Sequence, residues 1–150
     1  MNISRIHDTY FSISLLSVVM VLVLVLGDAM YIGIWYYLAI PIAALLIAWG
    51  FKSPPLFQTG AVLGLSVTFL IYLSLNWSAE RPEGLLGLGH LFSLPGAAIG
   101  LVLSAYIVKM RSIEGVLVGF TMGLLGVLAG FFINQMVVCN TVMWCGVLSV

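Results

Sequence analysis

The amino-acid sequence predicts an all-α integral membrane protein, a polytopic bundle of about five transmembrane helices. The first observation is composition: 63% of the 150 residues are hydrophobic and 7% are charged, whereas a soluble domain carries roughly 25% charged residues. The second is length, because a hydrocarbon core of about 30 Å needs roughly 20 apolar residues of helix. The third is pattern, since residues 18–26 are apolar at every position, whereas the strands of a β-barrel alternate.

Charged residues, prolines and glycines divide the chain into five apolar runs. Gly27 and Asp28 separate the first two, and a turn is required there because one continuous helix would be about twice the bilayer thickness. Pro54 and Pro55 close the second run, since neither can donate to a helix ladder. We therefore expect one integral membrane domain over residues 1–150. Its predicted spans are about 10–26, 31–51, 56–77, 85–108 and 115–138, followed by a short outer tail at 139–150.

The positive charges predict the orientation of these spans. Arg5, Lys52, Lys109 and Arg111 fall on one side of the five-span arrangement, and Arg81 falls on the other. Because cytoplasmic loops carry the excess of Lys and Arg, we expect the N-terminus in the cytoplasm and the C-terminus outside. Aromatic residues also gather at membrane interfaces. Those toward the outer interface are then Tyr31, Trp35, Tyr36, Tyr37, Trp77 and Trp144.

The first apolar run has one alternative interpretation, a cleaved secretory signal peptide, because Arg5 precedes it. Asp8 lies in what would be the basic region, and no Ala-x-Ala site follows the run. Both features favour a retained span.

Glycines recur at four-residue spacing in the last three spans, beginning with Gly60 and Gly64. In lipid, helices associate where small residues let their backbones approach closely. We expect these glycines to pack spans three, four and five together; in a second interpretation, one glycine face points outward and docks a partner or a second copy. The glycines assigned to helix packing or partner contact are Gly96, Gly100, Gly115, Gly119, Gly123, Gly126 and Gly130.

A few polar side chains lie inside the spans. His90, Asn134 and Gln135 fall in the outer half of the oriented arrangement, as does Asn76. Such groups usually form hydrogen bonds to a neighbouring helix. The functional alternative is a polar outer vestibule that contacts a ligand, an ion or another protein's helices.

Two prolines and two cysteines complete the set of unusual residues. Pro41 and Pro95 lie within spans two and four, where we expect kinks, with a broken-helix binding site as the alternative. Cys139 and Cys145 fall in the tail assigned to the outside. An oxidising compartment would allow a disulfide between them, provided that the chain turns; two unpaired thiols are the alternative.

The remaining polar residues exclude several classes of function. No Asp, Glu, Lys or Arg lies in the middle of a predicted span, whereas ion-coupled transporters keep an ionisable group near the midplane. Metal-ligand spacings, phosphate-binding loops and nucleophile elbows are missing from the sequence. We therefore expect no enzyme activity, no cofactor and no metal. The net charge is zero, and with no basic patch nucleic acid is not an expected partner.

Elimination leaves action by contact within the membrane. Small polytopic immunity proteins against pore-forming bacterial toxins look similar in size, short loops and lack of catalytic residues. We therefore expect a multi-pass protein of the bacterial inner membrane whose partners are the lipid bilayer and another membrane protein, a toxin to be neutralised or a complex subunit. The alternatives are a channel or solute transporter working as a homo-oligomer, an accessory or assembly subunit, and a membrane enzyme or redox protein using His90 or the cysteines.

Overall fold

The residues described by the computed structural model, 5–26, 33–78, 84–112 and 115–141, form five α-helices. These are α1 (Arg5–Leu26), α2 (Ile34–Gly50), α3 (Phe57–Ser78), α4 (Gly84–Met110) and α5 (Val116–Thr141). The all-α prediction is confirmed. Four of the helices are long and apolar enough to cross a membrane, which makes this a multi-pass membrane protein. The 17 residues of α2 span about 26 Å, slightly less than a hydrocarbon core of about 30 Å.

Two helix ends extend three or more residues beyond the predicted spans, in each case because polar residues find partners. α1 begins at Arg5 rather than near Tyr10, and it includes the buried Asp8. α5 continues to Thr141 rather than ending near Val138. The side chains of Asn140 and Thr141 donate to backbone carbonyls four residues back, at 2.6 and 2.7 Å, which lets these polar residues continue the helix.

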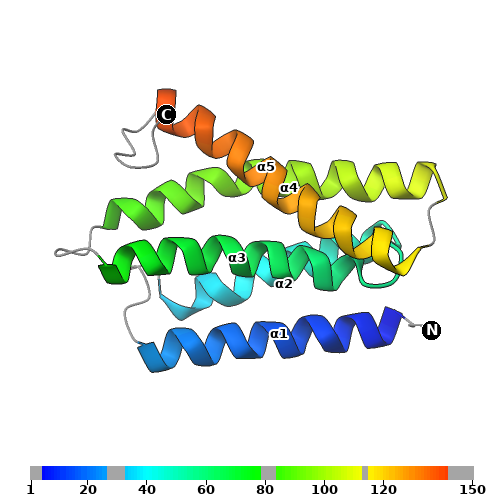
Figure 1. Ribbon diagram of the computed structural model, residues 1–150, viewed down its shortest axis with the longest axis horizontal. Coiled ribbons are helices and arrows are strands. Elements are labelled where there is room, and N and C mark those ends of the chain that lie inside the picture. Colours follow the sequence, from blue (N-terminus) through cyan, green and yellow to red (C-terminus); the bar gives the residue numbers. More distant parts are fainter. Residues whose placement is uncertain (1–4, 27–32, 79–83, 113–114, 142–150) are drawn as a thin grey trace.

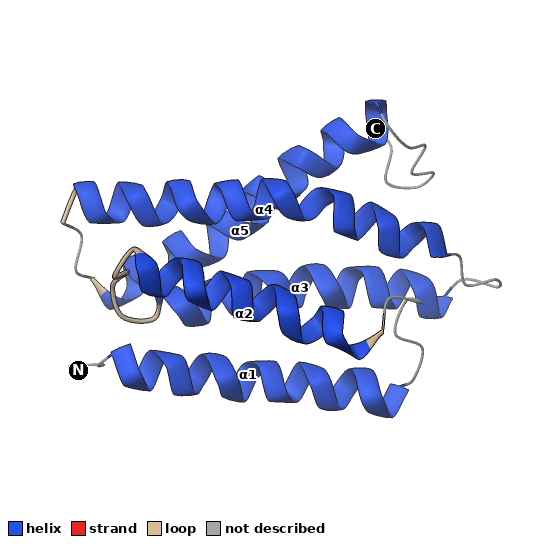
Figure 2. Cartoon of the chain, turned by 180° about the vertical axis from the view of Figure 1, so that it is seen from behind, coloured by secondary structure: helices blue, strands red, loops and turns tan. Residues whose placement is uncertain are grey.

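α3 is the central helix of the bundle. It contacts each of the other four helices, and most of its residues are buried. α1 and α2 lie on one side of it, while α4 and α5 lie on the other, with α5 crossing its neighbours at an angle (Figures 1 and 2). α2 and α4 continue through Pro41 and Pro95, so the predicted alternative of a broken-helix site is wrong for these two helices.

Asp8 fastens the start of α1 to the start of α3. Its carboxylate accepts hydrogen bonds from the backbone N–H groups of Gln58 (3.1 Å) and Thr59 (2.9 Å), and from the Thr59 hydroxyl (2.6 Å). The first N–H groups of a helix have no partner inside it and carry partial positive charge. Leu56, which precedes α3, has no side-chain acceptor to offer. Asp8 therefore caps α3 from another helix.

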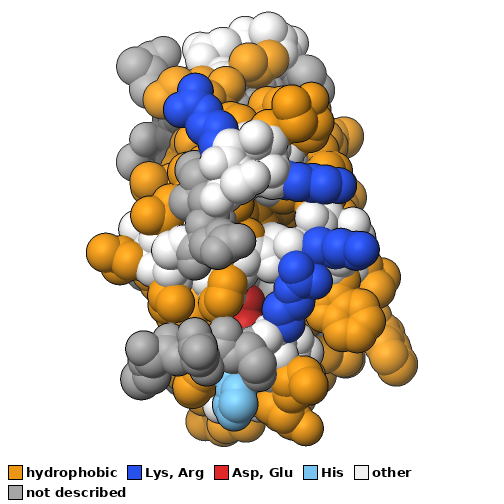
Figure 3. Space-filling view, turned by 90° about the vertical axis from the view of Figure 1, so that its right-hand side faces the viewer, with side chains coloured by type: hydrophobic (Ala, Val, Ile, Leu, Met, Phe, Trp, Pro, Cys, Tyr) orange, Lys and Arg blue, Asp and Glu red, His pale blue; other side chains and the backbone are white. Residues whose placement is uncertain are grey.

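Four cationic residues lie at the same end of the bundle, which we call the cationic end: Arg5, Lys52, Lys109 and Arg111. The Arg5 guanidinium donates to the Lys52 carbonyl oxygen at 2.8 Å, which joins the start of α1 to the segment after α2. Lys109 Nζ lies 6.0 Å from the ring centroid of Phe51, and Arg111 follows the end of α4. Figure 3 shows Lys and Arg side chains gathered on this face. Arg81 lies outside the described residues.

Candidate functional site

His90 is a residue of α4, and its side chain lies inside the bundle, where α4 meets α2 and α3. Its side chain is 0% exposed. Nδ1 is 2.7 Å from the Tyr36 hydroxyl, and Nε2 is 3.1 Å from Thr68 Oγ1. The ring stacks on Phe69, with centroids 4.9 Å apart, and contacts the edge of Tyr72. His90 therefore forms its polar contacts with residues of neighbouring helices inside the bundle.

The hydrogen bonds around His90 define its tautomer. Thr68 Oγ1 donates its single proton to the Leu65 carbonyl at 2.8 Å, so it accepts from His90 Nε2–H. Nδ1 then carries no proton and accepts from the Tyr36 hydroxyl. Both ring nitrogens are satisfied by a neutral imidazole. With both nitrogens engaged and the ring enclosed by aromatic side chains, His90 packs as a polar residue in the interior of the bundle.

Gln135 and Asn134 have different environments although they are adjacent in α5. Gln135 is 6% exposed; its carbonyl oxygen accepts a hydrogen bond from the Ser93 hydroxyl, and its amide donates to Cys139 Sγ at 2.8 Å. Asn134 is partly exposed and donates to the Phe92 carbonyl oxygen at 2.7 Å. Both side chains therefore tie α5 to α4, and Asn134 keeps part of its surface accessible.

The glycines of α5 lie on one face of the helix but contact two different neighbours. A Cβ on Gly123 would overlap the Phe57 carbonyl oxygen at the start of α3, and one on Gly119 would overlap the Pro55 carbonyl oxygen. Farther along, Gly126 and Gly130 meet α4 instead. α5 crosses both helices, so a single face serves both contacts in succession (Figure 1).

The glycines of α4 and α3 complete these contacts. Cβ atoms on Gly96 and Gly100 would overlap the carbonyl oxygens of Gly130 and Gly126, and Gly60 is equally close to the Phe120 carbonyl oxygen. Gly115 differs from the rest, because it precedes α5 and the nearest atoms to a Cβ there belong to Val118, three residues later in the chain, at 3.4 Å or more. Its assignment to a helix contact has no support in the described residues.

A shallow apolar groove of about 530 Å³ runs between α4 and α5 on the outside of the bundle. Gly96, Gly100, Gly126 and Gly130, where the two helices pack closely, form its floor, and Asn134 lies among its lining residues. Ile99 and Ile133 rise beside it and are 61% and 65% exposed. Small residues at the floor and large apolar ones at the rim give a surface that another helix or a lipid chain can fill.

Sequence reasoning grouped the four cations correctly, but it missed the hydrogen-bond partners of Arg5 and Asp8 at that end and the partners of His90. Asp8 and Arg5 read as ordinary end-of-span charges, because nothing in the sequence pairs them with residues some 50 positions later. The sequence pattern placed Tyr36 in the aromatic belt at the outer interface, yet its side chain is 8% exposed and forms a hydrogen bond with His90. The only indication of these contacts in the sequence was the occurrence of polar residues in neighbouring spans.

The described residues contain no group of three His, Cys, Asp or Glu side chains arranged to hold a metal ion. Cys139, near the C-terminal end of α5, is disulfide-bonded. Its predicted partner, Cys145, lies outside the described residues, so their pairing stays a prediction. No protein-family model, curated protein or solved structure matches this chain.

Proposed function

We propose that this protein acts without enzymatic chemistry, by direct contact between its helices and another membrane protein. We further propose that it is an immunity protein of a bacterial inner membrane and that its partner is a pore-forming toxin. The cationic end faces the cytoplasm in this proposal, following the excess of Lys and Arg. The N-terminus is then inside, and the C-terminal end of α5 reaches the outer side, where such a toxin enters.

The observation that carries the proposal is the groove between α4 and α5. A contact inside a membrane depends on close packing and a few hydrogen bonds, because lipid tails are as apolar as the helices. The groove offers both, with glycines at its floor and the partly exposed Asn134 among its lining residues. Discrimination between one toxin and another would come from the fit of side chains to this shape.

The internal contacts of the other polar residues narrow the surface available to a partner. His90 and Gln135 are buried and engaged inside the bundle. Apolar replacement of His90 or Gln135 would remove these internal hydrogen bonds as well as any contact with a partner. With these contacts, only Asn134 is a suitable probe of partner contact, since changes at the other two would disturb the core.

The experiment expresses toxin genes that neighbour this gene, directed to the periplasm, in cells with and without the protein. Survival and membrane potential are recorded. Ala129, an exposed residue of the groove, is replaced by Leu to fill it. Protection should weaken by about fivefold or more, because overpacking costs about 1–3 kcal/mol.

Ala43→Leu is the matched control, because Ala43 is exposed on α2 and does not line this groove. It adds the same volume and should leave protection unchanged. The immunity proposal fails if no neighbouring gene is toxic, or if the protein changes neither readout. A channel, a carrier or an accessory subunit would then be the better explanation. Equal effects of the two substitutions would mean that the partner does not bind in the groove.

A further inference from the structure

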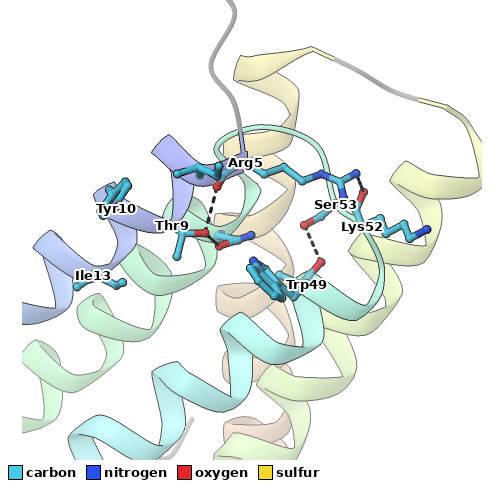
Figure 4. Close-up of a pocket in the computed structure, with 10 residues that line it drawn as sticks. Arg5, Thr9, Tyr10, Ile13, Trp49, Lys52 and Ser53 are labelled. Atoms are coloured by element: carbon cyan, nitrogen blue, oxygen red, sulfur yellow. Dashed lines mark hydrogen bonds between the residues drawn. The ribbon is translucent and has the colours of Figure 1, made fainter.

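A second cavity, also of about 530 Å³, opens at the cationic end between α1 and the end of α2. Tyr10 and Ile13 line it from α1, while Trp49 and Lys52 line it from the end of α2 and the segment that follows (Figure 4). Its inner side includes Gln58 of α3, whose Oε1 accepts a hydrogen bond from the Thr9 hydroxyl at 2.9 Å. Three helices therefore contribute to the cavity.

The polar part of this cavity is positively charged. Arg5 and Lys52 both line it, and within the part of the chain that the structure describes no acidic residue does. The Arg5 guanidinium crosses to the Lys52 carbonyl oxygen (Figure 4), and this bond uses one of its five N–H donors. The nearby Asp8 is 1% exposed, and its oxygens already accept three hydrogen bonds from α3. An anion between the two cations would therefore meet little opposing charge.

The apolar part of the cavity is accessible from the lipid side. Ile6, Tyr10 and Trp49 are 67%, 68% and 65% exposed, and all three line the cavity. Aromatic residues with one polar atom favour the level of lipid headgroups. A cationic mouth beside an apolar wall, at the end of a membrane bundle, matches a molecule with a phosphate at one end and a hydrocarbon chain at the other.

We propose that this cavity is a binding site for one anionic phospholipid. Its phosphate lies between the guanidinium of Arg5 and the ammonium of Lys52, and the upper part of an acyl chain runs along Tyr10, Ile13 and Trp49. The lipid joins α1 to the end of α2, supplementing the single hydrogen bond from Arg5 to Lys52. The site does not depend on the partner proposed above.

The experiment titrates the purified, delipidated protein with phosphatidylglycerol or with phosphatidylcholine of the same chains, and counts bound lipid by native mass spectrometry. Phosphatidylglycerol should bind more tightly. Lys52→Gln and Arg5→Gln should each weaken its binding about fivefold, from about 1 kcal/mol per cation. Lys52→Gln is the cleaner variant. Among the described residues the Lys52 side chain makes no hydrogen bond, whereas the Arg5 guanidinium donates to the Lys52 carbonyl oxygen.

Arg111→Gln is the matched control. It removes the same charge from the same end but does not line the cavity, so binding should be unchanged. Excess inorganic phosphate should not displace the lipid, because it lacks the apolar contacts. Equal binding of the two lipids would overturn the proposal, as would an effect of Arg111→Gln equal to that of Lys52→Gln. Displacement by phosphate would reassign the cavity to a free anion.

Discussion

At the scale of single residues, the most consequential contacts join helices that are distant in sequence. Asp8 caps α3 from α1, and His90 connects α4 to Tyr36 of α2 and Thr68 of α3. Each places a polar side chain where its hydrogen bonds are complete. A polar side chain is tolerated in an apolar interior when its hydrogen bonds are made. If that side chain is removed, its former partners stay buried without a hydrogen bond, which destabilises the fold. Both sites are therefore expected to contribute to stability rather than to chemistry.

Replacing Asp8 by Ala should destabilise the folded protein by about 2 kcal/mol or more, since it leaves two helix-end N–H groups without an acceptor. Asp8→Asn keeps one carbonyl oxygen and should cost less. Thermal unfolding in detergent measures both. Ser17→Ala is the control in the same helix, because Ser17 is exposed and bonds only the Ile13 carbonyl. If Asp8→Ala and Ser17→Ala unfold alike, the capping role is wrong.

Replacing Tyr36 by Phe should cost about 1 kcal/mol, because the hydroxyl that donates to His90 is lost while the ring contacts with Tyr37 and Phe69 remain. Tyr106→Phe removes the same atom from a side chain that is 51% exposed and should be neutral. Chemical denaturation of the two variants in the same detergent compares them. An unaltered midpoint for Tyr36→Phe would show that the hydroxyl does not support the core.

At the scale of helices, the glycine face of α5 determines how closely α3 and α4 can approach α5. α5 lies against backbone atoms of both neighbours, and a methyl group at most of these glycines would overlap a carbonyl oxygen. Val127 of the same helix is no suitable reference position for this face, because it is 1% exposed and lies against Gly64. A fair comparison therefore needs a glycine with space around it.

Gly89 provides that comparison, because a Cβ there would meet the Tyr72 ring at 3.8 Å, an ordinary contact. Gly89→Ala should be neutral or stabilising by up to about 1 kcal/mol, since alanine favours a helix. Gly123→Ala should destabilise by about 1–3 kcal/mol, because α5 must move away from Phe57. Thermal unfolding in detergent ranks the two. Equal melting temperatures would mean that α5 does not pack on α3 through this glycine.

At the scale of the whole molecule, the four cations of the cationic end lie together although they are separated by more than 100 positions of sequence. An odd number of crossings would place the two chain ends on opposite sides of the membrane. The placement of the two ends depends on the short α2, because if α2 did not cross the membrane, the C-terminus would lie in the cytoplasm. The proposed orientation therefore makes a sharp prediction for both ends.

A phosphatase reporter fused after Val150 should be active, because the C-terminus is proposed to lie in the periplasm, and one fused after Ser53 should be inactive. A reporter that functions only in the cytoplasm, fused at the same two positions, should give the reverse pattern. An inactive phosphatase after Val150, together with an active cytoplasmic reporter there, would contradict five crossings.

The sequence by itself determined the class of the protein, the number of helices and the grouping of its positive charges. Each of these depends on local composition, since about 20 apolar residues form a span wherever the chain places them. It also singled out the glycines of α4 and α5 as packing residues, because small residues at helical spacing have few other uses in lipid. Helix ends were less determined, as the start of α1 shows, since a polar first turn is stable only when its partners are known.

Only the tertiary structure decided which residues meet. One glycine face of α5 packs on α3 and then on α4 because the helix crosses both, and its crossing angle follows from all the side chains at the contact. The partners of Asp8 and His90 lie on other helices, at sequence distances over which no spacing rule operates. Whether a polar residue is exposed or engaged is a property of the assembled bundle. Its burial cost depends on which neighbours complete its hydrogen bonds.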